Sequence, residues 1–196
     1  MKIREVKEKY PLLPALGSCI WNLGYALFLF LLSFSQKSYW YLTLGMFFLA
    51  TGLMRLSDFT KIKHLLKING VVMLFLAVTI AGMNYLTIEE KINPQKNMIP
   101  ILAQAAFTFT FPGMAIAGLW KVRKKENQRE FLLRNVSMAS AIGSLLTLQR
   151  AMLGTFGDPL DPFTLQMEAS TGMGAFILLL VLSIGMIRAK EENQVS

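Results

Sequence analysis

The chain has 196 residues, of which 54% are hydrophobic, and it carries a formal net charge of +8. This apolar content is too high for an ordinary soluble domain of that length and is typical of an integral membrane protein. The basic residues lie between apolar stretches rather than in one patch, so the charge does not predict nucleic-acid binding. A single cysteine and a single histidine exclude an internal disulfide framework and a Cys/His zinc cluster.

Six apolar stretches are long enough to cross a bilayer, because about 20 helical residues span a hydrocarbon core about 30 Å thick. Lipid offers no partner for unpaired backbone groups, so these spans must be helical. The first stretch is longer than the apolar part of a secretory signal, and we expect it to remain as an uncleaved span. We therefore predict an all-α, single-domain bundle of six transmembrane helices over residues 12–34, 39–56, 69–87, 98–120, 135–155 and 164–187.

The lysines and arginines predict the orientation of this bundle. If the N-terminus is cytoplasmic, only Lys37, Lys91 and Lys96 lie in outer loops, Arg150 lies within a span, and all other basic residues lie on the inner side. This asymmetry follows the positive-inside rule. It predicts a multi-pass protein of the cell (plasma) membrane with both termini in the cytoplasm.

The longest inner segment, residues 121–134, is strongly basic. We expect it to contact anionic lipid headgroups of the bilayer, and docking of a partner protein there is the alternative.

The three helices predicted to run inward end in similar motifs, Gly52-Leu-Met-Arg55, Gly118-Leu-Trp-Lys121 and Gly185-Met-Ile-Arg188. These motifs could be the remnant of three repeated helical hairpins. The alternative is only a glycine near each helix end, followed by the basic residue that the inner side requires.

Catalytic and cofactor motifs are missing from the sequence. There is no phosphate-binding loop, no Gly-x-Ser-x-Gly and no His-Glu-x-x-His motif, and the single histidine, His64, falls in a predicted inner loop. Haem would need axial ligands within the spans, and the methionines are better explained as apolar filling. We therefore expect no enzyme activity, no cofactor and no metal.

Two ionisable residues nevertheless lie inside predicted spans, Arg150 in the fifth and Glu168 in the sixth. Each lies about 8 Å inside the outer end of its helix, so the two could meet at one level as an ion pair. Small and polar residues at helical spacing accompany both of them, which favours close helix contact. Charge within a membrane is costly and is the first place to look for function.

Two explanations of this pair remain open. The residues either neutralise each other and fix the last hairpin, or they face an outward-opening polar cavity in which Arg150 attracts an anionic solute and Glu168 binds a cation or a proton. Residues that could line such a cavity are Asn22, Gln104 and Thr147, and residues that could form its outer rim are Asp158 and Asp161. Asn22 and Gln104 could instead join helices by hydrogen bonds, and both aspartates precede prolines, as turn residues often do.

Two functional hypotheses follow. The first is a permease-like or solute-binding membrane subunit with its site in the last hairpin. The second is a non-catalytic accessory or regulatory membrane protein that acts through helix contacts and the basic segment 121–134. A membrane enzyme acting on lipid has little support among the residues.

Overall fold

The computed structural model describes residues 12–57, 64–89, 98–121, 128–156 and 161–189. This part of the chain is all-helical, which confirms the predicted class and the predicted number of helices. The helices are α2 (Leu12–Gln36), α3 (Tyr39–Ser57), α4 (Leu65–Glu89), α5 (Met98–Lys121), α6 (Gln128–Phe156) and α7 (Pro162–Arg188).

Helices α4 and α6 begin several residues earlier than their apolar stretches predicted. Helix α4 begins at Leu65 rather than at residue 69, and α6 begins at Gln128 rather than at residue 135. An apolar stretch marks only the part of a helix that lipid or protein covers, whereas helical hydrogen bonding continues through polar residues such as Lys67 and Glu130. The second half of the predicted loop 121–134 is therefore helical, and its residues 122–127 lie outside the described part of the chain.

Local side-chain chemistry defines the helix ends next to the candidate site. At the end of α2, Lys37 has a left-handed backbone (φ 51), and the Ser38 N–H returns to the Ser33 carbonyl at 3.2 Å, as in a common helix stop. At the start of α7, the Asp161 side chain accepts a hydrogen bond from the Phe163 N–H at 3.1 Å. Pro162 follows at a position where its missing N–H costs nothing.

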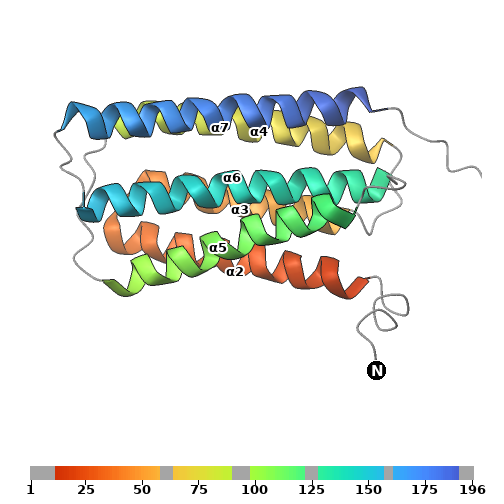
Figure 1. Cartoon of the computed structure of the whole chain (residues 1–196), viewed down its shortest axis with the longest axis horizontal. Coiled ribbons are helices and arrows are strands. Elements are labelled where there is room, and N and C mark those ends of the chain that lie inside the picture. The colour runs from red at the N-terminus through yellow and green to blue at the C-terminus, as the bar shows by residue number, and fades with distance from the viewer. Residues whose placement is uncertain (1–11, 58–63, 90–97, 122–127, 157–160, 190–196) are drawn as a thin grey trace, which may run out of the picture.

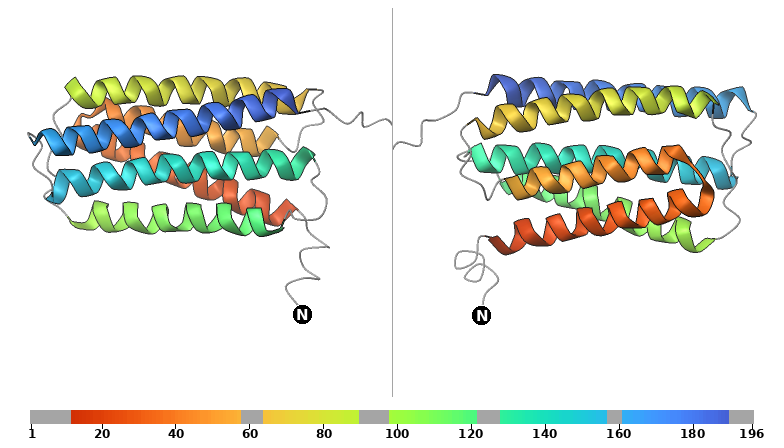
Figure 2. Two further views of the ribbon diagram at one scale, coloured as in Figure 1. Left: turned by 45° about the horizontal axis from the view of Figure 1, so that its top comes forward. Right: turned by 180° about the vertical axis from the view of Figure 1, so that it is seen from behind.

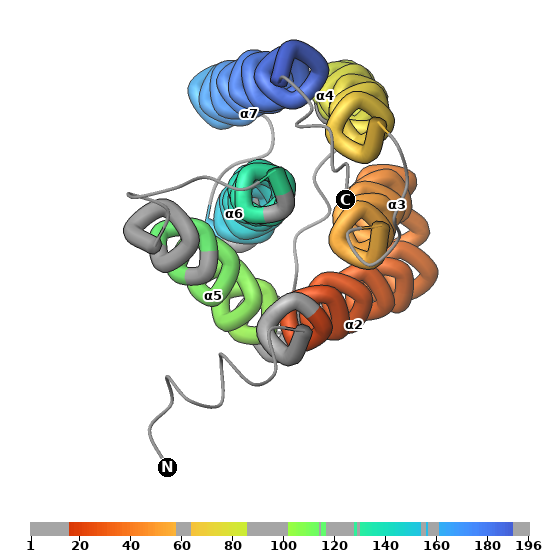
Figure 3. Tube along the Cα trace, turned by 90° about the vertical axis from the view of Figure 1, so that its right-hand side faces the viewer, coloured from red at the N-terminus to blue at the C-terminus, as the bar shows by residue number. Residues whose placement is uncertain are grey.

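The helices form three layers of two, α4 with α7, α3 with α6, and α2 with α5 (Figure 1). The same layers are seen from the opposite side (Figure 2). The end-on view shows that α3 and α6 lie between the other two layers (Figure 3). Within each layer the two helices run in opposite directions. The start of α2 and the end of α7 lie at the same end of the bundle.

The interior of the bundle is polar in many places, while its outer surface is apolar. Large exposed side chains such as Phe34, Phe75, Phe109 and Ile177 point outward from α2, α4, α5 and α7. Apolar surface on this scale marks contact with lipid or protein. Of the described helices, α2, α4, α6 and α7 are each long and apolar enough to cross a membrane. The fold is therefore that of a membrane-compatible helical bundle.

The helix pairing differs from three repeated hairpins. Helix α4 packs most extensively on α7, whereas α4 and its chain neighbour α5 share no substantial interface. The most extensive contacts otherwise join α2 to α3 and α5 to α6. The Gly-x-x-Arg/Lys endings are therefore better explained by glycine near a helix end and inner basic residues than by an equivalent packing unit.

Candidate functional site

The centre of the candidate site is the ion pair between α6 and α7. Arg150 Nη1 donates to Glu168 Oε1 at 2.8 Å, and the two residues are 5% and 7% exposed. The ring of Trp40, from α3, lies beside the same guanidinium, with 4.7 Å between the Arg150 Cζ and the ring centroid. A cation is attracted to the face of an aromatic ring. Arg150 is thus held by both a carboxylate and an indole inside the bundle.

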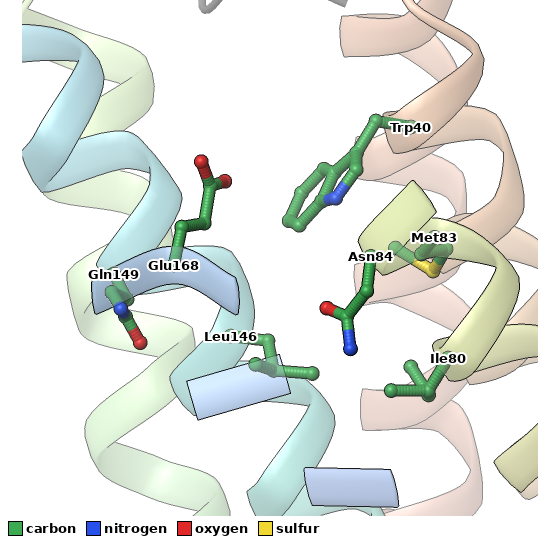
Figure 4. A pocket seen from close by; sticks show the side chains of 7 residues that line it. All are labelled: Trp40, Ile80, Met83, Asn84, Leu146, Gln149 and Glu168. Atoms are coloured by element: carbon green, nitrogen blue, oxygen red, sulfur yellow. The ribbon is translucent and has the colours of Figure 1, made fainter. Parts of the chain in front are cut away.

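Glu168 also borders a small pocket between α3, α4, α6 and α7. Its second carboxylate oxygen, Oε2, is buried and has no hydrogen-bond partner. Figure 4 shows Glu168 and Trp40 on opposite sides of this pocket, with Asn84 on the Trp40 side. The lining is completed by Ile80, Met83, Leu146 and Gln149.

The volume of this pocket limits what it can hold. It measures about 20 Å³, which is enough for one water molecule but not for an organic solute. Polar partners for a water are present, because the Glu168 carboxylate and the Asn84 and Gln149 amides all line the space. The pocket beside this pair is therefore too small to be the solute cavity that one of the two explanations of the pair requires.

The other predicted lining residues lie elsewhere in the bundle and do not line this pocket. Asn22 Nδ2 donates to Ser140 Oγ at 3.2 Å and to Thr51 Oγ1 at 3.4 Å, so its amide joins α2 to α3 and α6. The Thr147 hydroxyl donates to the Gly143 carbonyl of its own helix at 2.8 Å. Gln104 is fully buried on α5. The structure therefore separates the predicted residues into an ion-pair region and a second polar region.

This second polar region lies beside an aromatic cluster formed by α2, α3 and α5. The Tyr25 ring packs on Phe107 with a centroid distance of 4.6 Å and on Phe48 with the same distance. Its hydroxyl, the Asn22 Oδ1 and both amide atoms of Gln104 are buried without a hydrogen-bond partner. Such groups cost about 1–3 kcal/mol each when nothing pairs with them. They are the places at which bound water would stabilise the interior.

The two predicted rim residues have different outcomes. Asp161 caps the N-terminus of α7, which agrees with the turn-and-cap explanation for this residue. Asp158 lies outside the described residues.

The side chains at both ends of α3 are mostly buried inside the bundle. Arg55, which the sequence assigns to the inner side, is 2% exposed, and its Nη2 donates to Ser137 Oγ at 3.1 Å. At the other end of α3, Trp40 and Tyr41 are buried and Tyr39 is exposed. The sequence did not predict this burial, because the direction of a side chain depends on which helix packs beside it.

Sequence reasoning also missed Trp40, Asn84 and Gln149 as parts of the ion-pair region. Asn84 and Gln149 are polar residues within or near apolar stretches, and that feature was the available signal. Among the residues that the structure describes, no group of three or more His, Cys, Asp or Glu could hold a metal ion.

Comparisons with protein-family models, with curated proteins and with solved structures found no match for this chain. Its function is therefore inferred from its own residues and their geometry.

Proposed function

We propose that the protein is a six-span integral membrane protein of the plasma membrane with both termini in the cytoplasm. The distribution of lysine and arginine supports this orientation. Helices α3 and α5 would cross the membrane beside the four more apolar helices, since they run the length of the same bundle (Figure 1). In this topology the Arg150–Glu168 pair lies towards the outer side, and Arg55 lies towards the inner side.

We further propose that the ion-pair region binds a small polar solute or cation. The observation that carries this proposal is the Glu168 Oε2, a buried carboxylate oxygen without a partner at the edge of a pocket. Because Arg150 already bonds to Oε1, the ligand must itself supply a hydrogen-bond donor or a positive charge to Oε2. A ligand larger than water requires α4 and α6 to move apart, so binding would be coupled to helix movement.

The runner-up function is an accessory or regulatory membrane protein without a solute. The short Arg150–Glu168 distance of 2.8 Å and the small pocket volume favour it, since a closed pair is sufficient to hold α6 against α7. In this case the interface with a partner would be formed by outward-facing apolar residues and the basic segment 121–134.

Thiol accessibility distinguishes these two functions. In a Cys19→Ser background, Asn84→Cys places a thiol at the pocket, and Ala175→Cys places one on the buried face of α7 away from it. In intact cells, a small hydrophilic thiol reagent should modify Asn84→Cys but not Ala175→Cys if the pocket opens to the outside. Equal protection of both thiols would contradict the solute site and favour the accessory function.

A further inference from the structure

The contacts between helices have an internal symmetry. If α2, α3 and α4 are exchanged with α5, α6 and α7, the extensive α2–α3 contact becomes the extensive α5–α6 contact, and the smaller α3–α4 contact becomes the similar α6–α7 contact. The exchanged helices form the three layers and run in opposite directions (Figures 1 and 3). The two halves of the bundle are therefore related by an approximate two-fold axis perpendicular to the helices.

Side-chain contacts in the α4–α7 layer follow the same axis. Gly70 lies against Met186 and Ile187 of α7, with 3.2 Å between the place of a Cβ on Gly70 and the Met186 Cβ. Gly172 lies against Asn84 of α4, whose amide fills the place that a Cβ would need. Gly70 and Gly172 are separated by the same number of residues as Asn84 and Met186. Exchanging the two halves therefore converts the Gly70–Met186 contact into the Gly172–Asn84 contact.

The other two layers contain contacts on the axis itself. In the α3–α6 layer the rings of Phe47 and Phe48 both pack on Gly143, the Phe48 ring at 3.3 Å from the place of a Cβ, and we place the axis at the Phe48–Gly143 pair. In the α2–α5 layer Tyr25 packs on Phe107. Within each layer, one constant difference in residue number then relates buried residues of the first half to buried residues of the second half. These buried pairs are Asn22 with Gln104, Ala26 with Thr108, Leu29 with Phe111, Ser33 with Ala115, Leu44 with Ala139, Gly52 with Thr147, Arg55 with Arg150, Leu66 with Glu168, Met73 with Ala175, and Ala77 with Leu179.

The buried arginines are counterparts, but their surroundings differ. Arg150 has Glu168 as its carboxylate partner, whereas the symmetry assigns the apolar Leu66 to the position equivalent to Glu168. Within the described residues no carboxylate forms an ion pair with Arg55, whose Nε is buried and has no hydrogen-bond partner. The counterpart of Trp40, which covers Arg150, is Asn135, and its Nδ2 is likewise a buried donor without a partner.

We infer that helices α2–α4 and helices α5–α7 form an inverted repeat, and that Arg55 binds a small monoanion where its counterpart Arg150 binds Glu168. Three spans in each half place the halves in opposite orientations in a membrane, as in known inverted repeats. A buried guanidinium without a counter-charge is strongly unfavourable, and an anion would remove that cost. The inference does not depend on a solute at Glu168.

The chemistry of the site defines the class of its ligand. Arg55 Nε and Asn135 Nδ2 are free donors, and Ser137 Oγ is already bonded to the guanidinium. Chloride and the carboxylate of a small organic acid share the single negative charge and the acceptor capacity that these donors require. Because Arg55 is 2% exposed, a lipid headgroup at the membrane surface does not reach it.

Anion-dependent stability tests the site in the intact chain. The protein, purified in a neutral detergent and dialysed into sodium sulfate, whose divalent anion lies outside the proposed class, is titrated with sodium chloride or sodium acetate at constant ionic strength, and Tm is recorded. We expect a saturable rise of about 2–4 °C, because a ligand that binds only the folded state stabilises it. The more effective anion identifies a halide or a carboxylate ligand. No rise with either anion would overturn the proposal.

A designed carboxylate tests the repeat and the site together. Leu66→Glu puts a carboxylate at the counterpart of Glu168, so this variant should reach without chloride or acetate the Tm that the parent reaches with the anion, and should lose the anion dependence. The matched control Leu66→Gln should retain it. A Leu66→Glu variant that is less stable and still responds to anions would show that the counterparts do not correspond.

Arg55→Gln should also abolish the response, and if it does not fold, the two Leu66 variants decide. The proposed solute site at Glu168 is tested separately by thiol labelling of Asn84→Cys, so the two proposals can fail independently.

Discussion

Each of the two buried arginines carries a charge that the sequence places near a helix end. Arg150 is neutralised within the protein by Glu168. Breaking a buried pair by removing one partner costs about 3–5 kcal/mol, because the remaining charge stays buried, whereas replacing both partners by apolar residues is often neutral or stabilising. The pair is therefore poor evidence for a stabilising role and better evidence for a site at which charge is needed.

We predict that the effect of the Arg150–Glu168 pair on stability can be separated from its effect on function. Glu168→Leu alone should lower the free energy of unfolding by about 3–5 kcal/mol, and the double variant Arg150→Leu, Glu168→Leu should recover most of that loss. Thermal unfolding in detergent measures both. If Glu168→Leu alone has no effect on unfolding, the guanidinium does not depend on this carboxylate.

The same variants separate the two proposed functions. A solute-binding protein should remain folded but inactive as the double apolar variant, because the ligand contacts are gone. Retention of full cellular function by the double variant would instead identify a packing role for the pair.

At the scale of the element, helix extents depend on local sequence and were largely predictable. Six stretches of apolar residues correspond to the six helices, with starts displaced where polar residues extend α4 and α6. Which face of a helix packs inward was less predictable, because apolar residues occur all around each helix when its outer face contacts lipid. Trp40 and Arg55, both on α3, show this, because each is buried against other helices although the sequence did not predict which face of α3 packs inward.

The α4–α7 contact depends on small residues, and one of them provides a prediction. Gly172→Leu should destabilise the fold by about 1–3 kcal/mol, because the added side chain must displace the Asn84 amide and overpack the α4–α7 contact. Gly174→Leu is the matched control, since nothing lies within 4 Å of the place of its Cβ. Unfolding of both variants in the same detergent makes the comparison. Equal stabilities would show that α4 and α7 do not pack at Gly172.

At the scale of the whole molecule, the proposed topology makes a prediction about the loops on either side of α5. A reporter active only outside the cytoplasm should be inactive when fused after Lys125 and active when fused after Lys91. Activity after Lys125 would invert the proposed orientation, and with it the assignment of Arg55 to the inner side.

The sequence by itself determined the all-helical class and the number and approximate ends of the helices in the described part of the chain. It also singled out Arg150 and Glu168, since length, apolar content and charge within an apolar stretch are properties of the local chain. Only the tertiary structure decided that α4 pairs with α7, that Asn22 and Gln104 lie apart from the ion pair, and that Arg55 is buried. The physical reason is that helix pairing depends on how the surfaces of helices α2 to α7 fit together. The symmetry that relates Arg55 to Arg150 exists in the packing of those surfaces, whereas the residues around the two positions have little similarity in sequence.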